Sequence, residues 1–479
     1  MKKIIISIFM LSMLFTACDT NLDINRDPDS LSNVPLKSQL PAGIIGVIGA
    51  EGSYYALIGG FWSQYWTQSN ASNQYKDVDS YLIGTGDYFA AWRNMYDALG
   101  DIRSVKRNAQ AAGNWNYFLI ATVLEVQASQ VLTDFYGSIP YSEANNISIL
   151  EPKYDTGEEI YGFMIADLDL ALSKDLSTSV GEVPGSDDLV FQGDLSKWAK
   201  FANTLKLKIF MRQINSSRSA IGIAGVNSLL TSGVEFLDVD AAITQFEDAP
   251  SLSNPLYETD RRQLNTATNL RMSTTLSSFL VDNEDSRKPK YYGAGVALNQ
   301  GDFESQTPVA SSVSVVELSA TTPAYLMSKE ESLFLQAEAQ ARYGSGAKEL
   351  YDAAVIENFN KYSLDGSSYV ATEGAYEFPS AGTLEEKIEA IITQKWIAGF
   401  PGNGFEAFFD KNRTGYPKTS SVPQTDPDYV PGQLAYSING VTPGKLFPKR
   451  IVYPQEETNT NKNTPKLLKI TEPVWWAQN

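Results

Sequence analysis

The sequence contains no histidine and a single cysteine, and each absence excludes a class of chemistry. Without histidine, the chain can form neither a Ser-His-Asp nor a Cys-His catalytic group, and it has no imidazole metal ligand. With Cys18 as its one thiol, it can form no internal disulfide and no thiolate zinc site. The GxSxG, HExxH and P-loop motifs are absent as well. We therefore expect no catalytic residues, no cofactor and no metal site.

Positive charge is also scarce, with 38 lysines and arginines against 56 acidic residues and a net charge of −18. A nucleic-acid-binding surface needs clustered basic residues, so nucleic acid is not an expected partner. Attraction to an anionic lipid surface by charge alone is disfavoured for the same reason. The 479 residues are 43% hydrophobic, which allows a large core. At about 150 residues per domain, the length permits about three domains or one large one.

An apolar run lies at the N-terminus, where Lys2 and Lys3 precede the segment 4–15 and the small residues before Cys18. This is the pattern of a secretory signal, and it is shorter than the ~20 residues of a membrane span. A cysteine directly after small residues resembles a bacterial lipoprotein processing site. We therefore expect a signal peptide over 1–17 and a lipid anchor on Cys18. The alternative is an ordinary signal peptide in which Cys18 has no role.

The polar segment 18–35 predicts a flexible tether. Acidic and amide residues alternate in it as in a calcium loop, but Pro28 and Ser30 break the EF-hand pattern, so we expect no metal there. No other apolar stretch stands out as a membrane span, so we expect residues 36–479 to form a folded body held by the tether.

Helical periodicity dominates this body. The predicted helices cover 87–110, 115–137, 157–176, 194–214, 327–344, 347–364, 383–400 and 405–413. They form four pairs with Gly or Asn near the turns, and the pairs resemble tetratricopeptide units of irregular period. We predict an all-α fold with a helical scaffold over about 87–217 and 326–413. Loop-rich insertions over 218–325 and 414–479 are expected to carry a few short strands.

Two finer expectations concern helix ends and helix surfaces. Ser328 with Glu331, and Thr383 with Glu386, have the spacing of capping boxes. Lys208 is expected on a solvated helix face.

Several longer runs follow one another in a recognisable order. They are LDINRDPDS (22–30), LTDFYGSIPYSEA (132–144), FQGDLSKWAKFANTLKLKIFMR (191–212), LMSKEESLFLQAEAQAR (326–342), ITQKWIAGF with FFDKNRTGYP (392–417) and RIVYPQEETNTN (450–461). Together with the lipoprotein-like start, they resemble the SusD/RagB family of outer-membrane lipoproteins of Bacteroidetes. The resemblance spans essentially the whole chain.

This resemblance implies a fold of four tetratricopeptide-like helix pairs with a loop-rich half packed against them. It implies a lipid-anchored protein of the outer membrane, facing the cell surface, that is not an enzyme. Such proteins bind a nutrient, most often a glycan or oligosaccharide and in some members a peptide. They deliver it to a partner SusC-like TonB-dependent transporter. The resemblance transfers no ligand-binding residue, because the site differs between members.

Candidate ligand-binding residues therefore rest on chemistry alone. A sugar site needs aromatic faces for C–H surfaces and neutral amides for hydroxyl groups. The stretch FWSQYWTQSNASNQY (61–75) combines both, and a second aromatic pair lies near residue 291. The candidates are Trp62, Trp66, Asn70, Asn73, Tyr75, Tyr291 and Tyr292. The alternative is that these rings pack loops onto the scaffold, as we expect for Phe61 and Tyr65.

A surface glycoside hydrolase is a further alternative, because that chemistry needs two carboxylates and no histidine. With 56 acidic residues, candidate pairs are unavoidable. Examples lie in YKDVDSY (75–81), DLDLA (167–171) and FEDAP (246–250).

Overall fold

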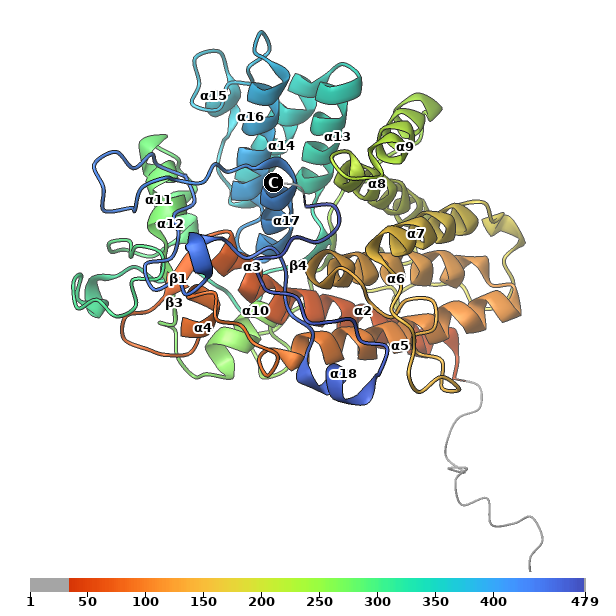
Figure 1. Cartoon of the computed structure of the whole chain (residues 1–479). Helices are drawn as coiled ribbons and strands as arrows, with labels where there is room; N and C mark the ends of the chain where they lie inside the picture. Colours follow the sequence, from red (N-terminus) through yellow and green to blue (C-terminus); the bar gives the residue numbers. More distant parts are fainter. Residues whose placement is uncertain (1–33, 478–479) are drawn as a thin grey trace, which may run out of the picture.

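The eight helices expected from periodicity are all present in the structure, a computed structural model that describes residues 34–477 (Figure 1). They are α5 (Phe89–Ala112), α6 (Trp115–Tyr136), α7 (Gly157–Leu172), α8 (Leu195–Gln213), α13 (Lys329–Tyr343), α14 (Ala347–Lys361), α16 (Leu384–Ala398) and α17 (Gly404–Thr414). The predicted all-α fold is confirmed. The predicted signal peptide, Cys18 and the tether up to residue 33 lie outside the described residues.

Shorter elements occupy the loop-rich regions. The helices there are α4 (Lys76–Asp79), α9 (Ser219–Ser232), α10 (Pro255–Tyr257), η3 (Glu258–Arg262), α11 (Thr274–Asp282), α12 (Lys288–Tyr291), α15 (Ser367–Val370) and α18 (Gln455–Thr460), with short 3₁₀ turns η2 (Leu176–Thr178), η4 (Ala310–Ser312) and η5 (Pro443–Lys445). Strand β1 (Trp66–Gln68) pairs antiparallel with β3 (Leu270–Met272), so that Trp66 lies opposite Met272. Strand β2 (Ala241–Ile243) pairs in the same way with β4 (Ala324–Met327).

A continuous helix at the start of the described chain joins the two halves of the scaffold. It consists of α2 (Leu36–Ala50), the π-helical turn η1 (Glu51–Tyr55) and α3 (Ala56–Trp62). By length and composition alone, Leu36–Trp62 is apolar enough to cross a membrane, contrary to our expectation for this part of the chain, but 72% of its most apolar window is buried inside the protein. Burial to this extent is what a core helix requires.

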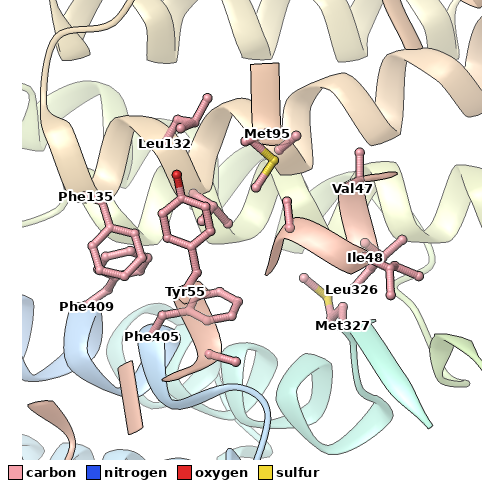
Figure 2. Close-up of a cluster of buried hydrophobic side chains, with 14 of the residues drawn as sticks. Val47, Ile48, Tyr55, Met95, Leu132, Phe135, Leu326, Met327, Phe405 and Phe409 are labelled. Atoms are coloured by element: carbon pink, nitrogen blue, oxygen red, sulfur yellow. The ribbon is translucent and has the colours of Figure 1, made fainter. Parts of the chain in front are cut away.

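Figure 2 shows how the core forms around this helix. Val47, Ile48 and Tyr55 come from the first helix, and they meet side chains from α5, α6, β4 and α17. The partners labelled there are Met95, Leu132, Phe135, Leu326, Met327, Phe405 and Phe409, all at most 2% exposed. Segments more than 300 residues apart in the sequence therefore share one core.

The helix ends show which capping expectations hold. Thr383 and Glu386 form a complete capping box at the start of α16, as predicted. At α13 the Ser328 hydroxyl accepts from the Glu331 N–H, but the carboxylate of Glu331 does not return the bond. It is drawn instead to the ammonium of Lys208, 2.8 Å away. The carboxylate of Glu331 thus forms an ion pair with another helix in place of the second hydrogen bond of the capping box.

A buried network of charges joins the helices of the scaffold. The guanidinium of Arg212 pairs with Glu406 at 2.6 Å and with Asp410 at 3.4 Å. Lys208 bridges Glu331 and Glu406, so the expectation that Lys208 is solvated was wrong. Each of these side chains is at most 5% exposed. Most of the network lies in the runs 191–212, 326–342 and 392–417 that carry the family resemblance, so their charged residues serve the architecture.

Candidate functional site

Five of the seven candidate ligand residues are aromatic, and the structure buries all five rings. Trp62, Trp66, Tyr75, Tyr291 and Tyr292 are each at most 3% exposed. Their faces are covered by other side chains, so no ligand can stack on them in this conformation. The structure therefore gives these rings the packing role that was the alternative to ligand binding.

Phe400 is the centre of this aromatic packing. Its ring stacks on Tyr291 with centroids 4.2 Å apart, and it meets the edges of Tyr292 at 5.5 Å and Trp66 at 6.3 Å. The hydroxyl of Tyr292 donates to the carbonyl oxygen of Tyr65 at 2.6 Å, and Tyr65 is buried as expected. Because Phe400 lies two residues after the end of α16, the cluster fastens β1 and α12 to the scaffold.

The two candidate amides lie in different surroundings. The side chain of Asn70 donates to the carbonyl oxygens of Ser305 at 3.0 Å and Pro308 at 2.9 Å, so it holds a loop in place. Asn73 is exposed and lines a shallow hollow of about 480 Å³. The one aromatic ring in that hollow, Phe303, is 7% exposed and lies under the ammonium of Lys76 at 5.1 Å. The hollow thus offers amides and charges without an open aromatic face.

Most of the carboxylates that suggested a hydrolase are engaged in structural contacts. Asp79 is fully buried, accepts from the hydroxyl of Thr67 at 2.6 Å, and has its pKa raised to about 6 by burial. Asp167 pairs with Lys106 at 3.0 Å. The other pairs behave alike: Asp169 pairs with Lys206 and Asp248 with Arg262. None of these carboxylates is placed as a free acid or nucleophile.

A larger cleft, of about 660 Å³, lies where α2, α5 and the segment 243–263 meet. Its floor is made of small residues of α2, and an added Cβ at Gly49 would meet no atom within 4 Å. One wall is α5, and the opposite wall carries the half-buried ring of Phe246. A cleft of this volume is in the range of small-molecule sites. Sequence reasoning missed it because its walls come from segments far apart in the chain.

Several polar side chains of this cleft have no partners in the part of the protein that the structure describes. Three of them, Asn94, Asp97 and Asp101, lie on α5 at helical spacing. Two glutamines, Gln245 and Gln263, line the cleft from the segment 243–263. Among residues 34–477, no hydrogen bond or ion pair engages the side chains of Asn94, Asp97, Asp101, Gln245 or Gln263, all of which line the cleft. Unpaired amides and carboxylates beside a half-buried aromatic ring are what sugar hydroxyls and C–H faces require.

Acidic side chains line the cleft, and one of them affects the pKa of another. Burial, together with the neighbouring carboxylate of Asp97, raises the pKa of Asp101. Glu258 adds a third carboxylate from the opposite wall, where it pairs with Arg262 at 3.2 Å, and Arg93 is the one cationic residue that lines the cleft. An anionic ligand would be repelled here, whereas neutral or cationic ligands are admitted.

Comparison with known proteins agrees with this architecture. A family model described as "Starch-binding associating with outer membrane" (SusD-like_2) matches residues 48–437. No curated protein matches the sequence.

Solved structures with the same fold come from several bacteria. A SusD homolog from Bacteroides uniformis is 26% identical with a TM-score of 0.72, over 93% of this chain and 99% of that one. A chitin-binding SusD homolog from Flavobacterium johnsoniae is 23% identical with a TM-score of 0.74, over 92% and 99% of the two chains. A SusD homolog from Bacteroides vulgatus is 24% identical with a TM-score of 0.73, over 93% and 97%.

Proposed function

Because this chain belongs to the SusD-like family of starch-binding, outer-membrane-associated proteins, we propose that it binds a glycan at the cell surface and delivers it to a transporter. Lipid on Cys18 would anchor it to the outer membrane, and residues 19–35 would tether the folded body. The partner would be a SusC-like TonB-dependent transporter. Neither catalysis nor nucleic-acid binding is part of this proposal.

The observation that carries the proposal is the cleft beside α5. Its unpartnered amides and carboxylates suit hydroxyl groups, and Phe246 suits the C–H face of a sugar. That a SusD homolog of the same fold is a chitin-binding protein supports a glycan as the ligand. A peptide ligand is the alternative that the family resemblance implies, so peptides belong in the test.

Binding is tested by calorimetry on the purified protein, with a broad panel of oligosaccharides that includes chitin and starch fragments, and with short peptides. We expect at least one glycan to bind, and Asp101→Asn to weaken it about tenfold by removing one charge-assisted hydrogen bond. Asp282→Asn is the matched control, because Asp282 is exposed at the end of α11 and lines none of the hollows described here. Binding of peptides without any glycan would contradict the proposal, as would release of reducing sugar by the purified protein.

The anchor and the partner are tested in the native membrane. We expect Cys18→Ala to move the protein from the membrane fraction to the soluble fraction, since the anchor is covalent lipid. We expect the wild-type protein, solubilised in mild detergent, to co-purify with a SusC-like transporter. Unchanged membrane association of the Cys18 variant would refute the anchor without touching glycan binding.

A further inference from the structure

A second hollow lies on the other side of α5 from the cleft. Its volume is about 240 Å³, and its walls come from α5, the loop 140–152 and α18. In Figure 1, α18 lies beneath α5. The residues that line this hollow include Phe89, Trp92, Tyr96, Asn145, Leu150 and Asn461.

The two hollows meet on the exposed face of α5. Arg93 and Asp97, one helical turn apart, line both of them, and both side chains are exposed. The guanidinium of Arg93 lies 5.6 Å from the ring centroid of Phe89, which belongs to the second hollow. Asp97 has no hydrogen-bond or ion-pair partner in the described part of the chain. The ridge between the hollows is thus polar and free to bind.

The second hollow has the aromatic surface that the first cleft has little of. Trp92 and Tyr96 pack with ring centroids 4.8 Å apart, and both line the hollow. The ring of Trp92 itself is 2% exposed, so the half-buried rings of Phe89 and Tyr96 provide the aromatic surface of the hollow. At the rim, Leu150 is 89% exposed, which is unusual for a large apolar side chain.

We propose that the cleft and the second hollow form one groove, which binds an extended glycan chain across α5 at Arg93 and Asp97. This deepens the proposed function and rests on it, because it names the ligand as a polymer segment instead of a single small sugar. Glu258 is paired with Arg262, and the remaining carboxylates of Asp97, Asp101 and Glu457 outnumber the guanidinium of Arg93 along the groove. The chain is therefore uncharged, without carboxylate or sulfate groups.

The test is the dependence of affinity on chain length. For whichever glycan of the panel binds, calorimetry compares its disaccharide with its hexasaccharide, in the wild type and in two variants of the second hollow. Leu150→Ala removes the apolar rim, and Thr460→Trp narrows the hollow at an exposed position of α18. Ile147→Ala is the matched control, because Ile147 lies in the same loop, is 97% exposed and does not line the hollow.

We expect the hexasaccharide to bind at least tenfold more tightly than the disaccharide. Leu150→Ala should weaken hexasaccharide binding about fivefold, because the shorter side chain buries less apolar surface against the glycan. It should leave the affinity for the disaccharide unchanged. Equal affinity for both lengths, or a hexasaccharide indifferent to both variants, overturns the groove and leaves the proposed function standing. Absence of binding by every glycan of the panel overturns the proposed function itself.

Discussion

Glu51 gives the sharpest test of the electrostatics inside the scaffold. It opens the π-helical turn η1, is 1% exposed, and accepts from the amide of Gln127 at 3.2 Å on both carboxyl oxygens. Burial raises its pKa from 4.5 to about 8, although the hydrogen bond from Gln127 and the ammonium of Lys208 lower the pKa; the carboxylates of Glu406 and Glu331 act in the same direction as burial. No ion pair to Glu51 occurs within residues 34–477.

The sign follows from proton linkage. Below pH 4.5 the carboxyl is protonated in both the folded and the unfolded chain, and it costs nothing. Between pH 4.5 and about 8 the folded chain binds one more proton than the unfolded chain, so stability falls as the pH rises. At 1.36 kcal/mol per pKa unit, the full cost above pH 8 is about 5 kcal/mol.

We therefore expect Glu51→Gln to be close to wild-type stability at pH 5 and more stable by up to about 5 kcal/mol at pH 9, because an amide has no charge to bury. Urea denaturation at the two pH values measures the difference, and all other titrating groups cancel between the two proteins. Glu349→Gln, at an exposed position of α14, is the control and should show no pH-dependent difference. If Glu51→Gln changes stability equally at both pH values, the carboxyl is not held neutral and the reasoning fails.

Three further substitutions test packing. Asp410→Asn should destabilise the protein by about 3–5 kcal/mol in urea, because the ammonium of Lys395, 2.8 Å away and 6% exposed, loses its ion pair. Gly59→Ala should destabilise it by at least ~1–3 kcal/mol, because the new Cβ would lie 2.1 Å from a backbone nitrogen of α17; Gly49→Ala, in open space, should not. Trp66→Ala should lower stability by about 3–5 kcal/mol and leave glycan affinity per folded molecule unchanged.

The Trp66 and Gly49 variants also test where each residue lies, in the core or in the cleft. Near-wild-type stability of Trp66→Ala would mean that the ring is not part of the core. Gly49→Ala is informative in a second way, because its methyl group would enter the floor of the cleft and should weaken glycan binding.

Amphipathic periods located scaffold helices such as α5, which buries one face and exposes the other, whereas α6 is buried on nearly every side. The helix α9 was missed, since its Gly, Ser and Thr residues have low helix propensity. Its two glycines have a packing reason: at Gly222 an added Cβ would lie 2.7 Å from the carbonyl oxygen of Phe210, and at Gly225 2.4 Å from the ring of Phe210. Close packing against α8 determines the conformation of α9, and the local sequence pattern gives no sign of that contact.

The site was less accessible to sequence reasoning than the fold. Aromatic residues such as Trp66 satisfy the chemistry of a sugar platform and of a core equally well. The deciding fact is whether another segment covers them, and here Phe400 does so from more than 300 residues away. The unpaired polar residues of the cleft, such as Asp97 and Gln245, carry no motif. Their signal is the absence of partners, which becomes visible only when the chain is folded.

The first helix also sets the order in which the protein can be completed. The hydroxyl of Ser63, directly after α3, donates to the carbonyl oxygen of Gly404 at 2.7 Å, and the indole of Trp396 donates to the carbonyl of Ser63 at 2.8 Å. The apolar helix Leu36–Trp62 is synthesised early, whereas the segments that cover it are synthesised near the end of the chain. Contacts so distant in sequence slow folding and leave apolar surface open to aggregation meanwhile. A chain that stopped before α16 would keep that surface uncovered, so correct maturation depends on the last quarter of the polypeptide.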